Sequence, residues 1–296
     1  MHNSTSSIAL PPLLLPVLAV VTAVCSLAIG TSYAKQLFPL IGAQGTSALR
    51  VGMSALVLLV FWRPWRWPIS RIDRYAVLRY GLALGCMNLM FYMALQTIPF
   101  GIAVAIEFIG PLGVALYYSQ RKLDYVWIAL VVLGLALLLP FKQDASALDP
   151  TGVAWAFGAA AAWATYIIFG KRAGHLHAGQ SVSLGLLAAS LIVVPVGVAH
   201  TGLDLLHPQL LLFGLAVAIV SSAIPISLEM YALKRLPRET FGVMLSIEPV
   251  VAALAGMLFL HELLAPSQWL AIGCIMAASI GSIASAGRKS RPPKPH

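Results

Sequence analysis

Ten runs of predominantly apolar residues follow one another along the chain, with short polar joints between them. Each run approaches the roughly 20 residues that an α-helix needs to cross the hydrocarbon core of a bilayer. The runs span residues 14–33, 42–62, 78–97, 101–119, 125–141, 151–170, 181–200, 209–233, 240–260 and 267–286. Prolines stand at several joints, where helices are expected to end. The pattern therefore predicts an all-α polytopic membrane protein with ten transmembrane helices.

The composition agrees with a membrane location. Hydrophobic residues make up 59% of the chain and charged residues only 10%, whereas soluble domains carry roughly 25% charged residues. So few charges cannot cover a surface that faces water, and the apolar excess must face lipid. The joints are too short to form a soluble domain, since the longest is about 63–77.

The basic residues predict an orientation in the membrane. The chain carries a net charge of +9 and 19 lysines and arginines. If both termini lie in the cytoplasm, sixteen of the 19 fall on the cytoplasmic side, Lys35 and Lys142 fall outside, and Arg50 lies within a run. This bias follows the positive-inside rule. The charge is then a topology signal and not a nucleic-acid site, and residues 287–296 form a basic cytoplasmic tail.

Two segments of the chain resemble each other at an offset of 138 residues. Residues 94–99 read ALQTIP and residues 232–237 read ALKRLP. The same offset takes Pro111 to Pro249. Chance similarity between apolar stretches is one explanation and internal duplication is the other, and the aligned prolines favour duplication.

A duplicated unit of five helices reverses its direction in the second copy, because five is odd. We therefore expect two inverted five-helix repeats, at residues 1–141 and 151–286. Inverted repeats are typical of secondary transporters, which bind their substrate near the midplane between the repeats.

Four charged residues fall inside the apolar runs, namely Arg50, Glu107, Glu229 and Glu248. A charge at the centre of a membrane helix costs on the order of 3 kcal/mol on insertion scales, so each is a functional hypothesis by default. Glu229 lies close to the predicted inner end of its run and could reach the interface, which gives it less weight.

Arg50 and Glu107 are predicted at equal depth, roughly 10 Å below the outer surface, from the helical rise of 1.5 Å per residue. Two interpretations follow. In one, the two side chains bind the carboxylate and ammonium groups of an amino acid, or Glu107 carries a proton. In the other, they form a buried ion pair that fixes two helices.

Two prolines predict breaks in the helices that face the centre. Glu248, near the predicted midplane, precedes Pro249, and Pro111 stands at the matching position of the first repeat. Proline removes a backbone N–H and frees a carbonyl. The breaks would flank one central cavity; the alternative is two ordinary proline kinks.

Amides and aromatic rings within the runs are further candidates for the lining of that cavity. Asn88 and Tyr92 are four residues apart, and Trp163 and Tyr166 are three apart, so each pair shares a helix face. A cavity lined by aromatic rings and a few polar groups suits a small metabolite. For any single ring, packing or interfacial anchoring is the alternative.

Catalytic motifs are absent from the sequence. It contains no Walker A loop, no HExxH, no GxSxG and no dinucleotide fingerprint. The cysteines are Cys25, Cys86 and Cys274, without the spacing of metal ligands. We expect no enzyme, no metal site and no cofactor.

Three stretches carry a resemblance to a known family. They are AKQLFPLIGAQGTSALRVG at 34–52, GCMNLMFYMALQTIPFGIAVAIEFIGPLGVAL at 85–116 and SLEMYALKRLPRETFGVMLSIEPVVAALAGMLFLHE at 227–262. Over nearly its whole length the sequence resembles the EamA branch of the drug/metabolite transporter superfamily. It is most similar to that branch's bacterial inner-membrane exporters of threonine and homoserine. These stretches contain the charged residues and prolines discussed above.

The resemblance implies ten helices in two inverted repeats and export of amino acids across the bacterial inner membrane. It also implies alternating access driven by the proton motive force, with a small amino acid, protons and the lipid bilayer as partners. Efflux of drugs or other metabolites, and uptake instead of export, are alternatives within transport. A membrane enzyme or a non-transporting assembly partner is the alternative from another class.

Overall fold

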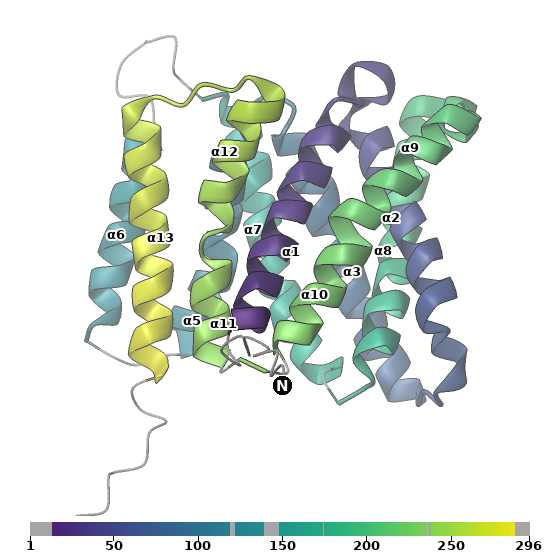
Figure 1. The fold of residues 1–296 in the computed structure, drawn as a ribbon, viewed down its shortest axis with the longest axis horizontal. Helices are drawn as coiled ribbons and strands as arrows, with labels where there is room; N and C mark the ends of the chain where they lie inside the picture. The colour runs from purple at the N-terminus through teal and green to yellow at the C-terminus, as the bar shows by residue number, and fades with distance from the viewer. Residues whose placement is uncertain are drawn as a thin grey trace, which may run out of the picture.

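A computed structural model describes residues 14–118, 122–138, 148–173, 175–233, 235–236 and 238–287. Within these ranges the regular secondary structure is entirely helical (Figure 1). Residues 139–141 of a predicted helix, and the predicted tail apart from Gly287, lie outside the described residues.

The helices cover the apolar runs, although the helix Arg71–Ala94 begins well before the predicted 78 and ends before the predicted 97. They are α1 Leu14–Lys35, α2 Phe38–Trp62, α3 Arg71–Ala94, α4 Phe100–Glu107, α5 Ile109–Tyr118, α6 Asp124–Leu138, α7 Pro150–Ala173, α8 Ala178–Thr201, α9 Pro208–Ala218, α10 Ile224–Leu233, α11 Arg238–Leu245, α12 Glu248–Leu260 and α13 Pro266–Gly287. Short 3-10 turns cover Pro64–Arg66 and Gly202–Leu206, and a π-helical turn covers Ile219–Ala223.

The described part of the chain contains eight helical stretches that are long and apolar enough to cross a membrane, and Tyr125–Leu137 is a shorter apolar helix. The prediction of an all-helical polytopic membrane protein is confirmed at this level.

Two of the predicted membrane runs are interrupted shortly before a proline. Phe108 separates α4 from α5, three residues before Pro111, and Ser246 and Ile247 separate α11 from α12, just before Pro249. Proline cannot donate a backbone hydrogen bond, and its ring collides with the carbonyl four residues earlier, so the preceding turn loses its regular geometry. The interruptions therefore lie in the turn before each proline and not at the proline itself.

Small residues let the helices of the two predicted repeats approach closely. α3 packs against α7 and α8, and α2 packs against α8. Where α3 meets α8, a Cβ added at Gly81 would collide with the Gly185 carbonyl, and one at Gly85 would lie 2.9 Å from the Ala189 carbonyl oxygen. Glycine at both positions allows this contact between backbones.

The helices that carry the candidate residues meet in the middle of the bundle. α6 and α13 lie together at one edge and α2, α8 and α9 at the other, with α1 between them (Figure 1). The central helices α1, α3, α4, α7 and α12 share one hydrophobic core, which includes Ala28, Phe91, Ile102, Ala156 and Ala252.

Candidate functional site

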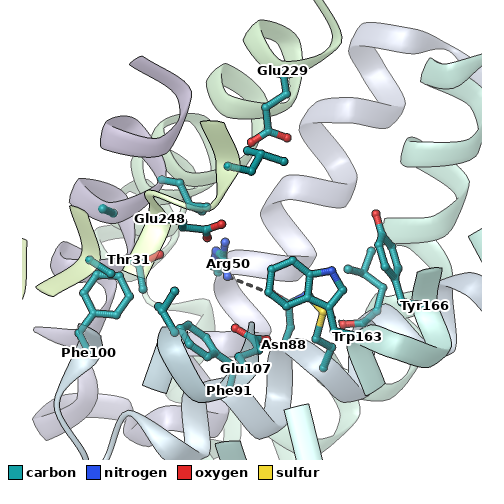
Figure 2. Close-up of a pocket in the computed structure, with 17 residues that line it drawn as sticks. Thr31, Arg50, Asn88, Phe91, Phe100, Glu107, Trp163, Tyr166, Glu229 and Glu248 are labelled. Carbon is teal, nitrogen blue, oxygen red and sulfur yellow. Dashed lines mark hydrogen bonds between the residues drawn. The ribbon is translucent and has the colours of Figure 1, made fainter. Parts of the chain in front are cut away.

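A cavity of about 210 Å³ lies between the central helices. It is lined by side chains from both halves of the chain, and its polar and aromatic members are Thr31, Arg50, Asn88, Phe91, Phe100, Glu107, Trp163, Tyr166, Glu229 and Glu248 (Figure 2). A second cavity of about 340 Å³ shares Arg50, Asn88, Tyr166 and Glu229 and extends past Tyr80 to Leu233 and Phe241. Because they share these side chains, the two cavities adjoin one another.

The guanidinium of Arg50 is held on two sides. Its Nη1 donates to Asn88 Oδ1 at 2.9 Å, and its Nε donates to Ser221 Oγ at 3.0 Å. Asn88 is fixed in turn, because its Nδ2 donates to the Leu84 carbonyl at 2.9 Å. The ring of Tyr92 lies beside the guanidinium, 5.4 Å from its central carbon to the ring centroid. Arg50 therefore has a defined orientation in the cavity wall.

Arg50 and Glu107 line the same cavity without a direct ion pair. Among the described residues, the ion pairs within 4.0 Å are Lys35–Glu262 and His175–Asp73, and Arg50 is in neither. Glu107 is only 6% exposed, and its Oε1 has no hydrogen-bond partner in the described part of the chain. The alternative of a fixed Arg50–Glu107 pair thus has no support in this geometry.

Three carboxyl groups and one guanidinium line this cavity (Figure 2). Glu107 is the last residue of α4 and Glu248 is the first of α12, so each stands at a helix interruption, and Glu229 extends from α10. The sequence interpretation gave Glu229 less weight as an interfacial residue, but it lines both cavities. A buried site with more carboxylates than cations is costly unless a proton or a bound cation compensates.

The predicted aromatic residues divide into two groups. Trp163 and Tyr166 line the cavity, with Trp163 edge-on to Phe108 at 5.3 Å between centroids. The Tyr166 hydroxyl lies 3.3 Å from the Tyr80 hydroxyl. Tyr92 is fully buried and is not among the lining residues, so it supports Arg50 from behind.

Several lining residues escaped the sequence interpretation. Phe91 follows Asn88 by three residues, so helical periodicity could have found it. Thr31 and Phe100 carry no charge and give no comparable signal. Ser221 belongs to the π-helical turn, and its only signal is Pro225, a proline in the middle of a predicted run.

Comparison with known proteins identifies the family. The chain is 50% identical over 280 residues to the threonine/homoserine exporter RhtA of Escherichia coli (strain K12), covering 95% of each chain. It is 51% identical over 271 residues to RhtA of Salmonella typhimurium (strain LT2), covering 92% of each. A family model described as the EamA-like transporter family matches residues 150–284. The chain belongs to this family.

More distant proteins are also similar to this chain. An uncharacterized transporter of Bacillus subtilis, YwfM, is 25% identical over 262 residues, covering 84% of this chain and 86% of that protein. One solved crystal structure matches with a TM-score of 0.58 at 18% identity, covering 95% of this chain and 99% of the other, which shows a shared fold alone. Because the family is one of transporters, the alternative of a membrane enzyme is set aside.

Proposed function

We propose that this protein exports small amino acids of the threonine and homoserine type across the bacterial inner membrane. The observation that carries the proposal is the identity of 50% over 95% of the chain to a threonine/homoserine exporter, together with a central cavity that contains both an arginine and carboxyl groups.

The two charged groups of an amino acid have complementary partners in the cavity. A guanidinium has five N–H groups. In Arg50, Nε, Nη1 and Nη2 each donate once to the protein, so two N–H groups remain for a carboxylate. Glu107, with an unpaired buried oxygen, and Glu248 are the partners for the ammonium group. This assignment gives each end of the substrate a charge-assisted hydrogen bond.

The contacts between helices support two inverted repeats. Adding 138 to the bounds of α4, 100–107, yields 238–245, which are the bounds of α11. Under the same offset α1 corresponds to α7, α2 to α8, and α3 to α9 and α10. The packing partners exchange accordingly: α1 packs on α10 as α7 packs on α3, and α1 packs on α12 as α7 packs on α5. Such exchange is expected of a twofold-related pair.

The arrangement of the helix ends supports an orientation with both termini in the cytoplasm. The described N-terminal end of α1 and the C-terminal end of α13 lie at the same side of the bundle, opposite the α12–α13 connection (Figure 1). The basic α2–α3 joint lies at the α7–α8 joint, where Gln180 Nε2 donates to the Trp67 carbonyl at 3.0 Å. By the positive-inside rule this side faces the cytoplasm.

The unequal ends of the cavity support a mechanism of alternating access. Toward the cytoplasmic side the space continues past Tyr80 to Leu233. Toward the opposite side, Glu262 pairs with Lys35 at 2.6 Å and accepts from the Phe100 N–H at 2.7 Å. This state is the inward-facing one, and export requires the Glu262 side to open. The excess of carboxyl groups suits proton coupling, with Glu107 as the proton carrier.

The test is counterflow of radiolabelled threonine into proteoliposomes that contain only this protein, with and without a pH gradient. Uptake into threonine-loaded vesicles, competed by homoserine and altered by the gradient, is expected. If no amino acid is moved by folded protein, the amino-acid assignment is wrong, and drugs and other metabolites become the substrates to test.

A further inference from the structure

The π-helical turn Ile219–Ala223, between α9 and α10, lies two residues before Pro225. A regular α-helix bonds each N–H to the carbonyl four residues earlier, and a π-turn bonds it to the carbonyl five earlier. Proline has no N–H to give. At Pro225 the missing donor therefore leaves the Ser221 carbonyl without its α-helical partner, and the Val220 carbonyl without its π-helical partner.

Side chains from other helices bind both of these carbonyls. Ser26 Oγ, from α1, donates to the Val220 carbonyl at 2.6 Å. Arg50 Nη2, from α2, donates to the Ser221 carbonyl at 3.4 Å, in addition to the 3.0 Å bond from Nε to Ser221 Oγ. Ser221 thus accepts twice from one guanidinium. Wide turns of this kind are frequent at functional sites.

The surroundings hold the turn in place against Arg50. Ser221 is 2% exposed, and a Cβ added at Gly30 of α1 would lie 2.7 Å from the Ser221 Cβ, so the backbones are in close contact. Ser54, one turn after Arg50 on α2, donates to Ser222 Oγ at 2.8 Å. Two consecutive serines of the turn therefore bond to two positions of α2: the hydrogen bonds from Arg50 to the turn go to Ser221, whereas Ser222 bonds to Ser54.

We propose that Ser221 is a positioning residue for substrate recognition: with Asn88 on the other side, it orients the Arg50 guanidinium so that its remaining N–H groups face the cavity. The proposal rests on the proposed function, in which Arg50 binds the substrate carboxylate. Asn88 comes from the first repeat and Ser221 from the second, so the binding group is held between the two halves. A long, flexible arginine binds a carboxylate more tightly when its orientation is set before binding.

The test compares Ser221→Ala with the matched control Ser222→Ala, which removes the same hydroxyl from the same turn without touching Arg50. In threonine counterflow, Ser221→Ala is expected to raise KM about tenfold, the effect of losing a hydrogen bond to a charged group, with the maximal rate changed by less than about twofold. Ser222→Ala is expected to keep the KM of the wild type.

A second readout separates positioning from general damage to the cavity. Threoninol, which has the amino and hydroxyl groups of threonine but no carboxylate, is used as a competitor of threonine counterflow. Ser221→Ala is expected to leave its inhibition constant within about twofold of the wild-type value, because only carboxylate binding depends on Arg50. If Ser221→Ala weakens the binding of threonine and of threoninol equally, the positioning role is overturned.

A third variant serves if Ser221→Ala does not fold. Pro225→Ala restores the missing N–H, lets the helix return to the α-register and turns Ser221 away from Arg50, so it too should raise the KM for threonine and spare threoninol. Wild-type KM in both Ser221→Ala and Pro225→Ala would overturn this inference alone. A wild-type protein that moves no amino acid would overturn the proposed function and this inference with it.

Discussion

The two ends of the central cavity are lined by different interactions. At one end Glu262 contacts both Lys35 at the end of α1 and the first N–H of α4, over a core in which Leu95, Ile98 and Ile102 are at most 2% exposed. At the other end the cavity passes a single Tyr80–Tyr166 contact of 3.3 Å and reaches Leu233, which is 49% exposed.

Under the proposed alternating access, this difference indicates which contacts would have to break for the cavity to open to the other side of the membrane. The Glu262 end combines an ion pair with a buried apolar core, and the ion pair joins the two predicted repeats. The Tyr80 end has a long hydrogen bond between neutral groups, which contributes little. Under the proposed alternating access, opening the Glu262 end is therefore the step that would lead to an outward-facing state.

The largest expected effect lies between the two ends, at Glu107. Glu107→Gln keeps the size of the side chain but removes its charge and its ability to bind and release a proton. We expect export driven by a pH gradient to be abolished, while the protein still elutes as a single folded species. Transport is measured in proteoliposomes, with Ser222→Ala as the control variant, because Ser222 bonds to Ser54 and carries no charge. Normal gradient-driven export by Glu107→Gln would remove Glu107 from the mechanism.

The next effect concerns the closed end. Lys35→Met removes an ion pair whose side chains are 18% and 15% exposed, worth about 1 kcal/mol for a pair of limited exposure. The outward-facing population should rise about fivefold. The measurement uses Thr31→Cys in a protein whose Cys25, Cys86 and Cys274 have been replaced. A membrane-impermeant thiol reagent is added from the outside, and the rate of labelling at position 31 is recorded.

The control for that measurement is the charge exchange Lys35→Glu with Glu262→Lys. It restores an ion pair at the same place and should return labelling toward the wild-type level. Labelling that is the same with and without Lys35 would mean that the packed core alone closes this end.

A smaller effect is expected at the open end. Tyr166→Phe removes the hydroxyl that lies 3.3 Å from the Tyr80 hydroxyl, and a neutral bond of this length contributes at most about 1 kcal/mol. Labelling of the Thr31 cysteine should change by less than with Lys35→Met. A larger change than at Lys35 would reverse the ranking of the two ends.

The smallest effect is a pH dependence of stability at the closed end. Asp149 precedes α7, and bonds from Thr97, Thr151 and Gly152 hold the pKa of its carboxyl below the usual value of 3.8. The carboxylate therefore contributes stability above the unfolded-state pKa, and the contribution is lost as the pH falls through the folded-state pKa. Asp149→Asn keeps an acceptor at the start of α7 without the charge, so between pH 6 and pH 3 its Tm should fall less than that of the wild type. If Tm falls equally with pH in the wild type and in Asp149→Asn, Asp149 does not contribute this pH dependence.

The sequence by itself determined the helices and the unusual charges. The apolar run 267–286 corresponds to α13, Pro266–Gly287, because bilayer thickness sets the length of an apolar helix. The predicted helix ends were wrong where a helix extends beyond its apolar residues. α3 begins at Arg71, before the predicted run 78–97, because its first turns are polar and Ser70 caps them. α2 begins at Phe38, before the predicted 42, across a kink at Gly42, where φ is 68°.

The tertiary structure alone decided which groups meet. Equal depth predicted that Arg50 could pair with Glu107, but depth does not determine the direction of a side chain around its helix axis. The packing of α2 on α3 and on the π-turn directs Arg50 to Asn88 and Ser221 instead. Tyr92 shares a helical face with Asn88, yet it is buried behind the arginine. Such partners depend on the rotation and kinks of neighbouring helices, which a linear pattern of apolar residues does not encode.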